Sequence, residues 1–412
     1  MNNLSVSKVT YLQLAASYAP AWGFGGTVRV LYDYAQWAAE KYETVAVITS
    51  DINHDYTVLN DKSDLYGKVN VYRVPMLCHK LSRKNVNILS IKMFSRAVSI
   101  IKNSSGNVVI HFGELRGSVP IYVVILKKMF PTKVRVVYSS FGHLHTKKSK
   151  LRDIFDYFFL GSILSNIDTV LAQNEHEASC YEEMSLKASK ALKSQVTVFP
   201  LHSTVPDYIN VDDARSNQHD HQAARIRSKL DISEDAFVLV FLGRLHPEKG
   251  IFRAIDAFNK FQKKYEGESF FLIIGKDDGF QSQAEAYIED LSLNSSVRVI
   301  NNVYEDRFEY YCASDLFVGF PTIYEETMLS SVEALCCGIP LLVSKEADIP
   351  FVESENAGFV IDYTVEEAVR CMLKVSLNKE EFRKQAKAIA SKYFLSENAK
   401  SVFFKILESN LS

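Results

Sequence analysis

Two positively charged side chains flank a short turn in the stretch FLGRLHPEKG, residues 241–250. The apolar run before the turn has the pattern of a β-strand, and Gly243 ends it. Arg244 and Lys249 would then lie at the carboxyl end of a strand, where open α/β sheets bind their ligands. The planar fork of an arginine and the mobile ammonium of a lysine can together hold a diphosphate. The alternative is that both are exposed loop charges.

Three glutamates occur in IYEETMLSSVEALCCGIP, residues 323–340. In a helix, Glu326 and Glu333 would lie almost in line, because they are seven residues apart. We instead expect the helix to begin near Thr327, with its hydroxyl as the N-cap. Glu325 then falls in the preceding loop and Glu333 inside the helix. Stabilisation by the helix dipole is the alternative explanation for Glu325 and Glu326.

A glycine-rich stretch, YAPAWGFGG, lies between an apolar run and a helical pattern near the N-terminus. Gly23, Gly25 and Gly26 at such a strand-to-helix turn let backbone N–H groups approach a phosphate, whose charge the helix N-terminus favours. Their spacing is not the G-x-G-x-x-G fingerprint of dinucleotide-binding proteins. A glycine-rich turn with a purely structural role is the alternative.

Short apolar runs alternate with amphipathic helical patterns along the whole chain. This alternation, with strands too apolar to have a solvated face, predicts parallel sheets covered by helices on both sides. Examples of the helical patterns lie at 27–41, 251–265, 281–291 and 327–337. The candidate strands are 9–15, 44–50, 69–75, 107–112, 134–140, 168–173 and 196–200, followed by 237–243, 270–275, 297–301, 316–321, 340–344 and 358–362.

A polar stretch at 207–235 interrupts the alternation and has the composition of a linker or of a long surface loop opening into a helix. We therefore expect two Rossmann-like α/β domains, over residues 1–205 and 206–385. The last segment, 386–412, contains an apolar helical face that needs a partner surface. We expect it to pack back on the first domain.

Composition describes an ordinary globular protein: 412 residues, 47% hydrophobic and 23% charged. The six cysteines include no C-x-x-C pair, which argues against a disulfide framework or a zinc site. The longest apolar run, 119–126, is far shorter than the ~20 residues of a membrane-spanning helix. The N-terminal residues make a poor signal peptide. These features predict a cytoplasmic protein.

Charge is distributed unequally between the two halves. Residues 1–205 hold 24 Lys and Arg against 15 Asp and Glu, a net of +9, and the remainder has a net of −11. Basic clusters lie at 80–92, 127–135 and 147–152, the last running into DIFDYFFLGSIL. Basic residues beside apolar aromatics suit an anionic membrane surface, although lysines on solvated helix faces are the alternative. No nucleic-acid partner is expected, because no recognised binding module accompanies the charge.

Taken together, these motifs resemble those of the retaining glycosyltransferases of the GT-B fold, most closely family 4. The resemblance rests on GFGG, on G-R-L-x-P-E-K-G, and on E-x7-E followed by A-L-x-x-G-x-P. It covers roughly residues 237–365 in the family's order and is looser in the first half, through IHFGELRG and AQNEHEASCY. It implies two Rossmann-like domains whose parallel sheets face each other across a cleft.

The resemblance also implies roles for single residues. Glu325 would meet the hydroxyls of the donor sugar, and Glu333 the ribose hydroxyls of the nucleotide, since carboxylates accept hydrogen bonds from hydroxyl groups. Arg244 and Lys249 would stabilise the diphosphate as it leaves. Met328 stands where the family usually has a glycine whose backbone approaches the donor. The expected donor-binding residues are Gly25, Gly26, Gly243, Met328, Leu329 and Glu333.

The first half departs from the family at its histidines. The family often has H-x-H-E where this chain has H-F-G-E at 111–114, so the second histidine is missing. We expect His111 or His143 to act as a catalytic residue on the acceptor side; a structural role is the alternative for each. Further acceptor-side residues are expected at Glu114, Arg116 and His145.

The predicted activity is transfer of a sugar from a UDP- or GDP-linked donor, with retention of anomeric configuration by front-face attack. The predicted acceptor is a glycan or a polyprenyl-linked lipid in bacterial surface polysaccharide biosynthesis, at the inner face of the cytoplasmic membrane. No D-x-D stands at a strand end, so we expect no essential metal and no other cofactor. Asp277 and Asp278 are expected to form a turn.

Three other functions remain as alternatives. A sugar-nucleotide epimerase of the same fold would need a dense acid–base cluster, whereas the histidines here are scattered. A two-lobed solute-binding protein would need an export signal. A degenerate transferase kept as a nucleotide-sugar-binding protein would agree with Met328 and with the missing histidine.

Overall fold

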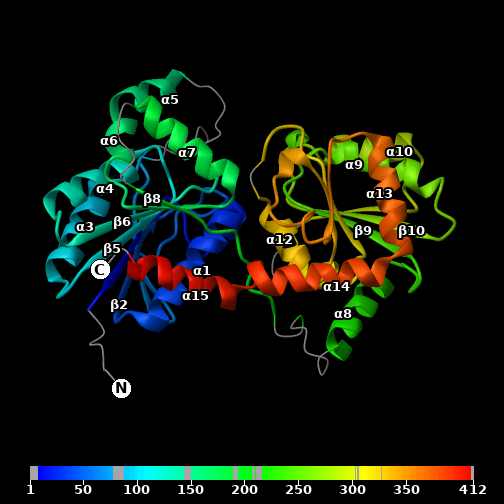
Figure 1. Ribbon diagram of the computed structural model, residues 1–412, viewed down its shortest axis with the longest axis horizontal. Coiled ribbons are helices and arrows are strands. Elements are labelled where there is room, and N and C mark those ends of the chain that lie inside the picture. The colour runs from blue at the N-terminus through cyan, green and yellow to red at the C-terminus, as the bar shows by residue number, and fades with distance from the viewer. Residues whose placement is uncertain are drawn as a thin grey trace. The chain divides into compact units, whose positions relative to one another are not determined.

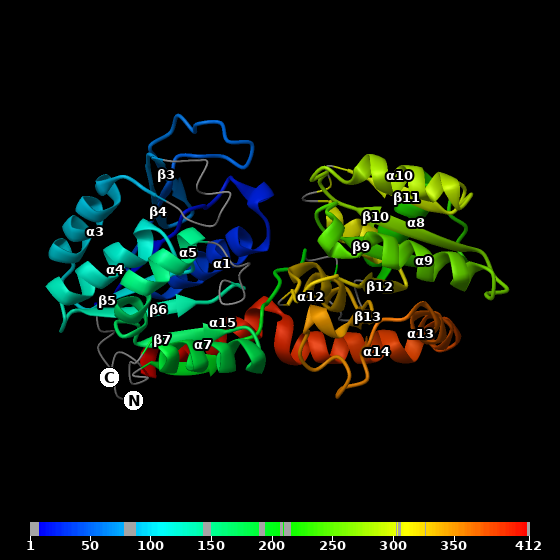
Figure 2. The same cartoon turned by 90° about the horizontal axis from the view of Figure 1, so that it is seen from above.

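A computed structural model of the chain describes residues 8–77, 88–142, 150–188, 194–206, 209, 216–301, 303, 306–325 and 327–409. By their contacts the residues fall into two compact units, 1–199 together with 400–412, and 200–399. Each unit has a central sheet with helices on both faces (Figures 1 and 2). The three-layer α/β arrangement predicted from the strand–helix alternation is therefore confirmed.

The first unit is built on one sheet with strand order β3-β4-β2-β1-β5-β6-β7-β8. Its neighbouring strands pair in parallel, except that β3 pairs antiparallel with β4. This edge strand departs from the all-parallel sheet expected from the sequence, because a tight turn at Gly67, with a φ of 62°, folds β3 back onto β4. The strands are β1 (Thr10–Leu14), β2 (Thr44–Ser50), β3 (Ser63–Tyr66), β4 (Val69–Val74), β5 (Val108–Phe112), β6 (Val134–Ser139), β7 (Thr169–Ala172) and β8 (Gln195–Val198).

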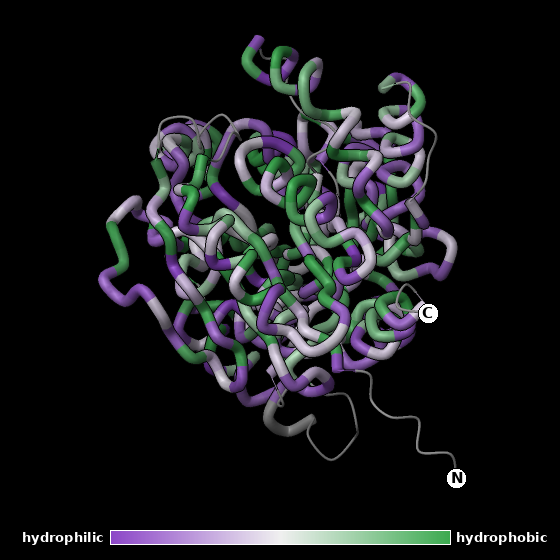
Figure 3. The backbone as a smooth tube through the Cα atoms, turned by 90° about the vertical axis from the view of Figure 1, so that its left-hand side faces the viewer, coloured by the Kyte–Doolittle hydropathy of each residue, from purple (hydrophilic) through white to green (hydrophobic). Residues whose placement is uncertain are grey.

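Apolar and polar residues alternate along the helices of this unit, as the green and purple bands in Figure 3 show. In α1, for example, the buried residues include Val30, Leu31, Tyr34 and Trp37. The helical elements are η1 (Trp22–Phe24), α1 (Gly26–Lys41), α3 (Ile91–Asn103), α4 (Ser118–Met129), α5 (Lys150–Phe155), η2 (Asp156–Leu160), α6 (Gly161–Leu164) and α7 (Glu175–Lys187).

The last helix, α15 (Ser396–Ser409), completes the core of the first unit. The Phe403 ring is fully buried and stacks on Tyr34, with ring centroids 4.8 Å apart and planes 6° from parallel. It also meets the ring of Tyr11 on β1 edge-on at 6.4 Å. Residues from both ends of the sequence thus share one aromatic cluster.

The second unit has a parallel sheet with strand order β11-β10-β9-β12-β13-β14. Its strands are β9 (Phe237–Leu242), β10 (Ser269–Ile274), β11 (Val297–Ile300), β12 (Leu316–Gly319), β13 (Leu341–Ser344) and β14 (Gly358–Ile361). The helical elements are α8 (Ser216–Lys229), η5 (Pro247–Lys249), α9 (Ile251–Gln262), α10 (Gln281–Asp290), α11 (Arg307–Cys312), α12 (Leu329–Cys336), η6 (Lys345–Ala347), α13 (Val365–Leu377), α14 (Lys379–Ile389) and η7 (Ala390–Phe394).

Candidate functional site

The turn after β9 is held in place by its glycine and by hydrogen bonds to its neighbours. Gly250 has a φ of 69°, and a Cβ there would lie 1.7 Å from the carbonyl oxygen of Phe320, so a glycine is required. The N–H of Thr322 donates to the carbonyl of Glu248 at 2.9 Å. The turn is therefore tied to the loop that follows β12, at the carboxyl edge of the sheet.

This arrangement brings Lys249 and Glu325 together. The Lys249 ammonium donates to Oε1 of Glu325, and the two side chains are only 17% and 23% exposed. The N–H of Glu325 donates to the carbonyl of Glu346 at 2.7 Å, which fixes the glutamate from the other side. Two residues predicted to bind the donor, 76 positions apart in sequence, thus form one ion pair.

Arg244 lies on the same edge and is more exposed. Its side chain is 57% exposed and donates to Asp278 at 2.5 Å. Such an exposed pair contributes little to stability, so the guanidinium can exchange the carboxylate for a bound anion at small cost. The neighbouring Asp277 accepts the backbone N–H groups of Gly279, Phe280 and Gln281 at 2.9–3.0 Å, and these bonds lower its pKa. The turn predicted for these two aspartates is confirmed.

The helix after Glu325 begins later than the sequence predicts. Helix α12 starts at Leu329 with Met328 in the N-cap position and no capping side chain. The Thr327 hydroxyl donates instead to the carbonyl of Asp348 at 3.2 Å, so its prediction as N-cap was wrong. Met328 accounts for the later helix start. Its side chain is buried and packs so closely against Gly319 that its Cε would lie 2.6 Å from a Cβ added to that glycine. Glu325 lies outside the helix, as expected, and Glu326 lies outside the described residues.

Glu333 is buried beneath this loop and carries a partner that sequence reasoning missed. Its Oε1 accepts from Nε and Nη2 of Arg307 at 2.9 and 2.7 Å, while the Tyr311 hydroxyl lies 3.4 Å from Oε2. Burial lowers the pKa of the Arg307 guanidinium, but the charge and the hydrogen bond of Glu333, together with smaller contributions from Tyr311 and Cys337, outweigh burial, and the net shift is upward. Arg307 and Tyr311 lie on α11, and nothing in their spacing signals the contact.

In the first unit, the glycine-rich turn leads straight into α1. Gly25 has a φ of 104° and is the N-cap, and a Cβ there would meet nothing within 4 Å. The glycine is therefore needed for its backbone conformation, and the start of α1 at Gly26 stands open. An open helix N-terminus of this kind suits an anion.

His111 lies in the core of the first unit. It is fully buried, its Nδ1 is 2.6 Å from the Tyr11 hydroxyl, and its Nε2 is 2.8 Å from the Ser139 hydroxyl. Burial lowers its pKa to about 3, so the ring is neutral. With both nitrogens hydrogen-bonded inside the protein, His111 has the features of a structural histidine. His143 and His145 lie outside the described residues.

Glu114 and Arg116 follow β5. Oε1 of Glu114 accepts the N–H of Ala16 at 2.6 Å, while its Oε2 is buried with no hydrogen-bond partner among the described residues. Burial raises the pKa of this carboxyl to about 7, so it can hold or release a proton near neutral pH. Arg116 instead forms a two-point ion pair with Asp156, at 2.9 and 2.7 Å.

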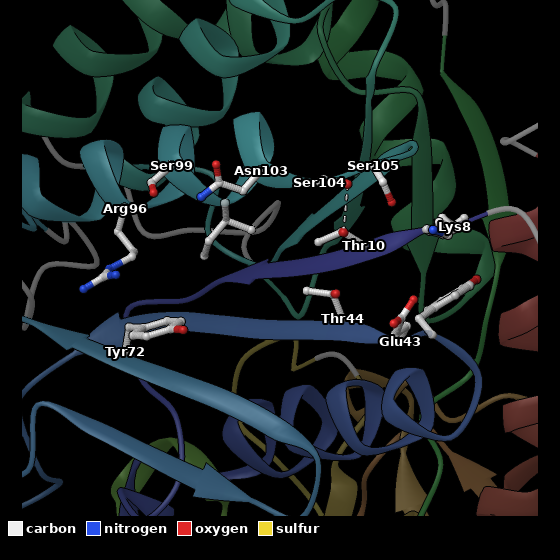
Figure 4. Close-up of a pocket in the computed structure, with 13 residues that line it drawn as sticks. Lys8, Thr10, Glu43, Thr44, Tyr72, Arg96, Ser99, Asn103, Ser104 and Ser105 are labelled. Carbon is white, nitrogen blue, oxygen red and sulfur yellow. Dashed lines mark hydrogen bonds between the residues drawn. The ribbon is translucent and has the colours of Figure 1, made fainter.

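A hollow of about 630 Å³ lies elsewhere in the first unit, at the amino ends of β1 and β2 (Figure 4). Lys8 and Arg96 line it, and the hydroxyls of Thr10 and Ser104 are 2.9 Å apart there. Open α/β sheets bind ligands at the opposite, carboxyl edge. The candidate site is therefore assigned to the loops that follow β9 and β12 and not to this hollow.

Within the part of the chain that the structure describes, no group of three or more His, Cys, Asp or Glu side chains is placed to hold a metal ion. In the same residues, none of the helices combines the length and apolar character needed to cross a membrane.

Residues 222–393 match the family model described as glycosyl transferases group 1. Curated relatives include the alpha-monoglucosyldiacylglycerol synthase of Acholeplasma laidlawii, 28% identical over 180 residues, which are 43% of this chain and 44% of that protein. The lipopolysaccharide 1,2-N-acetylglucosaminetransferase of Salmonella typhimurium is 24% identical over 154 residues, 36% of this chain and 39% of that protein. Each alignment spans less than half of the relative's length.

Among solved structures, Anabaena Alr3699/HepE in complex with UDP and glucose is similar over 97% of this chain and 99% of that chain. The TM-score is 0.70 at 16% sequence identity. At this identity the likeness shows the fold, and the GT-B fold predicted from the sequence is confirmed.

Proposed function

We propose, from the match of residues 222–393 to the model of glycosyl transferases group 1, that the protein transfers a sugar from a nucleotide-sugar donor to a glycan or lipid-linked acceptor. The observation that carries the proposal is the Lys249–Glu325 ion pair at the carboxyl edge of the second sheet. This pair places a cation that can bind a phosphate beside a carboxylate that can accept hydrogen bonds from sugar hydroxyls.

Lys249 and Arg244 bind the donor diphosphate in this proposal. Both follow β9, and the partners of both are carboxylates that a diphosphate can replace or share. Gly25 and Gly26 of the first unit remain predicted donor-binding residues, and the open N-terminus of α1 suits an anion. We propose a UDP- or GDP-linked donor; the similarity to a structure solved with UDP and glucose puts UDP first in any screen.

Glu325 and Glu333 bind hydroxyl groups of the donor in this proposal. Glu325 accepts hydrogen bonds from hydroxyls of the sugar, and its ion pair with Lys249 keeps the lysine oriented. Oε1 of Glu333 accepts hydrogen bonds from Arg307, and among the described residues its Oε2 has one long contact, to the Tyr311 hydroxyl. We assign the ribose hydroxyls to Oε2, because that oxygen has the larger unused capacity to accept. Gly243, Met328 and Leu329 remain predicted backbone contacts.

The reaction proposed is front-face transfer with retention. The bond between the sugar C1 and the diphosphate oxygen breaks with its electron pair going to the diphosphate. The acceptor oxygen forms the new bond to C1 on the same face, and its proton passes to the leaving phosphate oxygen. Lys249 and Arg244 stabilise the negative charge that develops on that oxygen.

The acceptor proposed is a glycan or a polyprenyl-linked glycan of bacterial surface polysaccharide, reached from the cytoplasmic side of the membrane. Two relatives, alpha-monoglucosyldiacylglycerol synthase and lipopolysaccharide 1,2-N-acetylglucosaminetransferase, are named for a glycolipid and for a lipopolysaccharide, which supports a lipid-linked or glycan acceptor. The basic first half of the chain suits such a location.

The test is a panel of UDP-, GDP- and ADP-sugars, each incubated with the protein with and without polyprenyl-linked acceptor. Release of nucleoside diphosphate is measured, and thermal shift with the free nucleotides identifies the base. We expect turnover of one nucleotide class. Binding of a nucleotide without turnover of any donor would identify a non-catalytic binding protein and overturn the proposal.

A further inference from the structure

One helical segment of the first unit exposes five large hydrophobic side chains. The segment runs through α5, η2 and α6, and we call its exposed side the 151–159 face. Its exposed fractions reach 84% for Tyr157 and 68% for Phe158. A single exposed hydrophobic residue is ordinary, but a contiguous group marks an interaction surface. The face consists of Leu151, Ile154, Tyr157, Phe158 and Phe159.

The opposite side of the segment holds it on the unit. Phe155 and Leu160 pack against the core. Asp156 accepts two hydrogen bonds from Arg116, whose residue is only 6% exposed. Because the segment is anchored by both apolar contacts and an ion pair, the direction of the 151–159 face is set by the fold.

The exposed rings support one another. Phe159 lies 5.0 Å from the core-facing ring of Phe155, Phe158 lies 6.4 Å from Phe159, and Tyr157 meets Phe158 edge-on at 5.1 Å. Residues 156–160 form a π-helix, which has more residues per turn than an α-helix. Successive side chains are therefore rotated about the helix axis by a smaller angle than in an α-helix. Three consecutive aromatic residues can therefore share one side.

We propose that the 151–159 face inserts into the headgroup layer of an anionic lipid membrane. Aromatic rings favour the membrane–water interface, where the ring meets lipid and a tyrosine hydroxyl stays hydrated. Lys150, exposed beside the face, and the +9 net charge of residues 1–205 attract anionic headgroups. Of the two acidic residues in the segment, Asp156 is neutralised by Arg116, which leaves Asp153 exposed.

Charge also argues against a second copy of the chain as the partner that covers the 151–159 face. Two such faces in contact would bring both Lys150 side chains and two units of like net charge together, which is unfavourable. A lipid surface of opposite charge has no such cost. The proposal does not depend on the proposed transferase activity, because lipid binding needs neither donor nor acceptor, so each can fail without the other.

The first test is flotation with vesicles of phosphatidylcholine, with or without about a third of phosphatidylglycerol. We expect the protein to bind the anionic vesicles and Tyr157→Ser/Phe158→Ser to bind them at least ~10-fold more weakly. Leu377→Ser is the matched control, since Leu377 is 81% exposed on α13 of the other unit, and it should bind like wild type. Unchanged thermal unfolding shows that the variants fold.

Lys150→Glu tests the electrostatic contribution to vesicle binding. It should weaken binding to anionic vesicles, and added salt should weaken wild-type binding in the same way. Equal binding of wild type and of Tyr157→Ser/Phe158→Ser would overturn the proposal, as would failure of the wild type to bind anionic vesicles. A dimer that the same double substitution abolishes, without vesicle binding, would assign the face to a second copy.

A depth measurement gives an independent readout. Tyr157→Trp should gain fluorescence that brominated lipid quenches, whereas Leu377→Trp should not be quenched. Absence of quenching at Tyr157→Trp with vesicles bound would place the contact elsewhere on the protein and overturn the proposal.

Discussion

The ammonium of Lys249 and the carboxylate of Glu325 lie in a setting where solvent screens them little, with 17% and 23% of the side chains exposed. We predict that Lys249→Ala and Glu325→Ala each reduce kcat/KM by ~10²-fold or more, because each removes a group that meets charge or hydroxyls in the transition state. Steady-state kinetics with the preferred donor measures this effect.

The matched control for that pair is Lys345→Ala, which breaks an ion pair with Asp362 in the same unit whose members are 63% and 82% exposed. An exposed pair contributes little, so kcat/KM should stay within about twofold of wild type. Near-native rates for both Lys249→Ala and Glu325→Ala would refute the site.

Glu114→Gln should change how stability depends on pH. Burial raises the pKa of the Glu114 carboxyl to about 7, above the ~4.3 of an unfolded chain. Between these values the folded state keeps a proton that the unfolded state has lost, so the free energy of unfolding falls as pH rises through this window and is level above it. Glutamine cannot ionise, so the variant should gain about 1–3 kcal/mol over wild type between pH 5 and 8.

Urea unfolding across this pH range measures the Glu114 effect. Glu182→Gln, at an exposed position on α7, is the control and should follow the wild-type curve. A difference between Glu114→Gln and wild type that is the same at every pH would contradict the prediction.

At single residues, the sequence indicates where loop side chains lie better than it indicates the contacts of buried side chains. The positions of Lys249 and Glu325 follow from where two strands end, which apolar runs reveal. The Arg307–Glu333 pair joins two helices and depends on how they pack, so no local pattern announces it. His111 was predicted on the acceptor side from the family resemblance, whereas its side chain is fully buried and both of its ring nitrogens have hydrogen-bond partners.

At the level of elements, predicted strands and helices agree with the structure in place and type, and errors concentrate at ends. Helix α12 begins two residues after Thr327 because Met328 is drawn into the core against Gly319. Capping propensity favoured Thr327, but tertiary packing of a large apolar side chain outweighed it. The antiparallel β3 was missed for a related reason, since its alternating exposed and half-buried residues do not resemble an apolar run.

Helix α15 provides the prediction at this scale. Phe403→Ala should lower the free energy of unfolding of the first unit by about 3–5 kcal/mol, because it removes a fully buried ring. The neighbouring Val402→Ala is the control: Val402 is 44% exposed, so its truncation should cost less than about 1 kcal/mol. Denaturant unfolding followed by circular dichroism distinguishes them, and equal losses would show that α15 is not held by Phe403.

At the level of the whole molecule, two Rossmann-like domains were predictable because strand–helix alternation and a polar interruption are both visible in the sequence, and the family resemblance added the GT-B fold. The family resemblance was concentrated at 237–365, and the family model matches 222–393. The first half resembles the family less closely in sequence, yet its sheet, like that of the second unit, has a core of parallel strands. A core accepts many apolar residues of suitable size, whereas loops that bind one ligand accept few.

The chain leaves the first unit at residue 199 and returns to it at residue 400. A ribosome adds about 5–20 residues per second, so the rings of Tyr11 and Tyr34 wait on the order of ten seconds or more for Phe403 to emerge. All of residues 200–399 can fold during that wait. Translation that stops early would release an intact second unit joined to an unfinished first one, a product that chaperones and proteases recognise by its exposed aromatic core. A stable first unit thus requires synthesis to continue through α15.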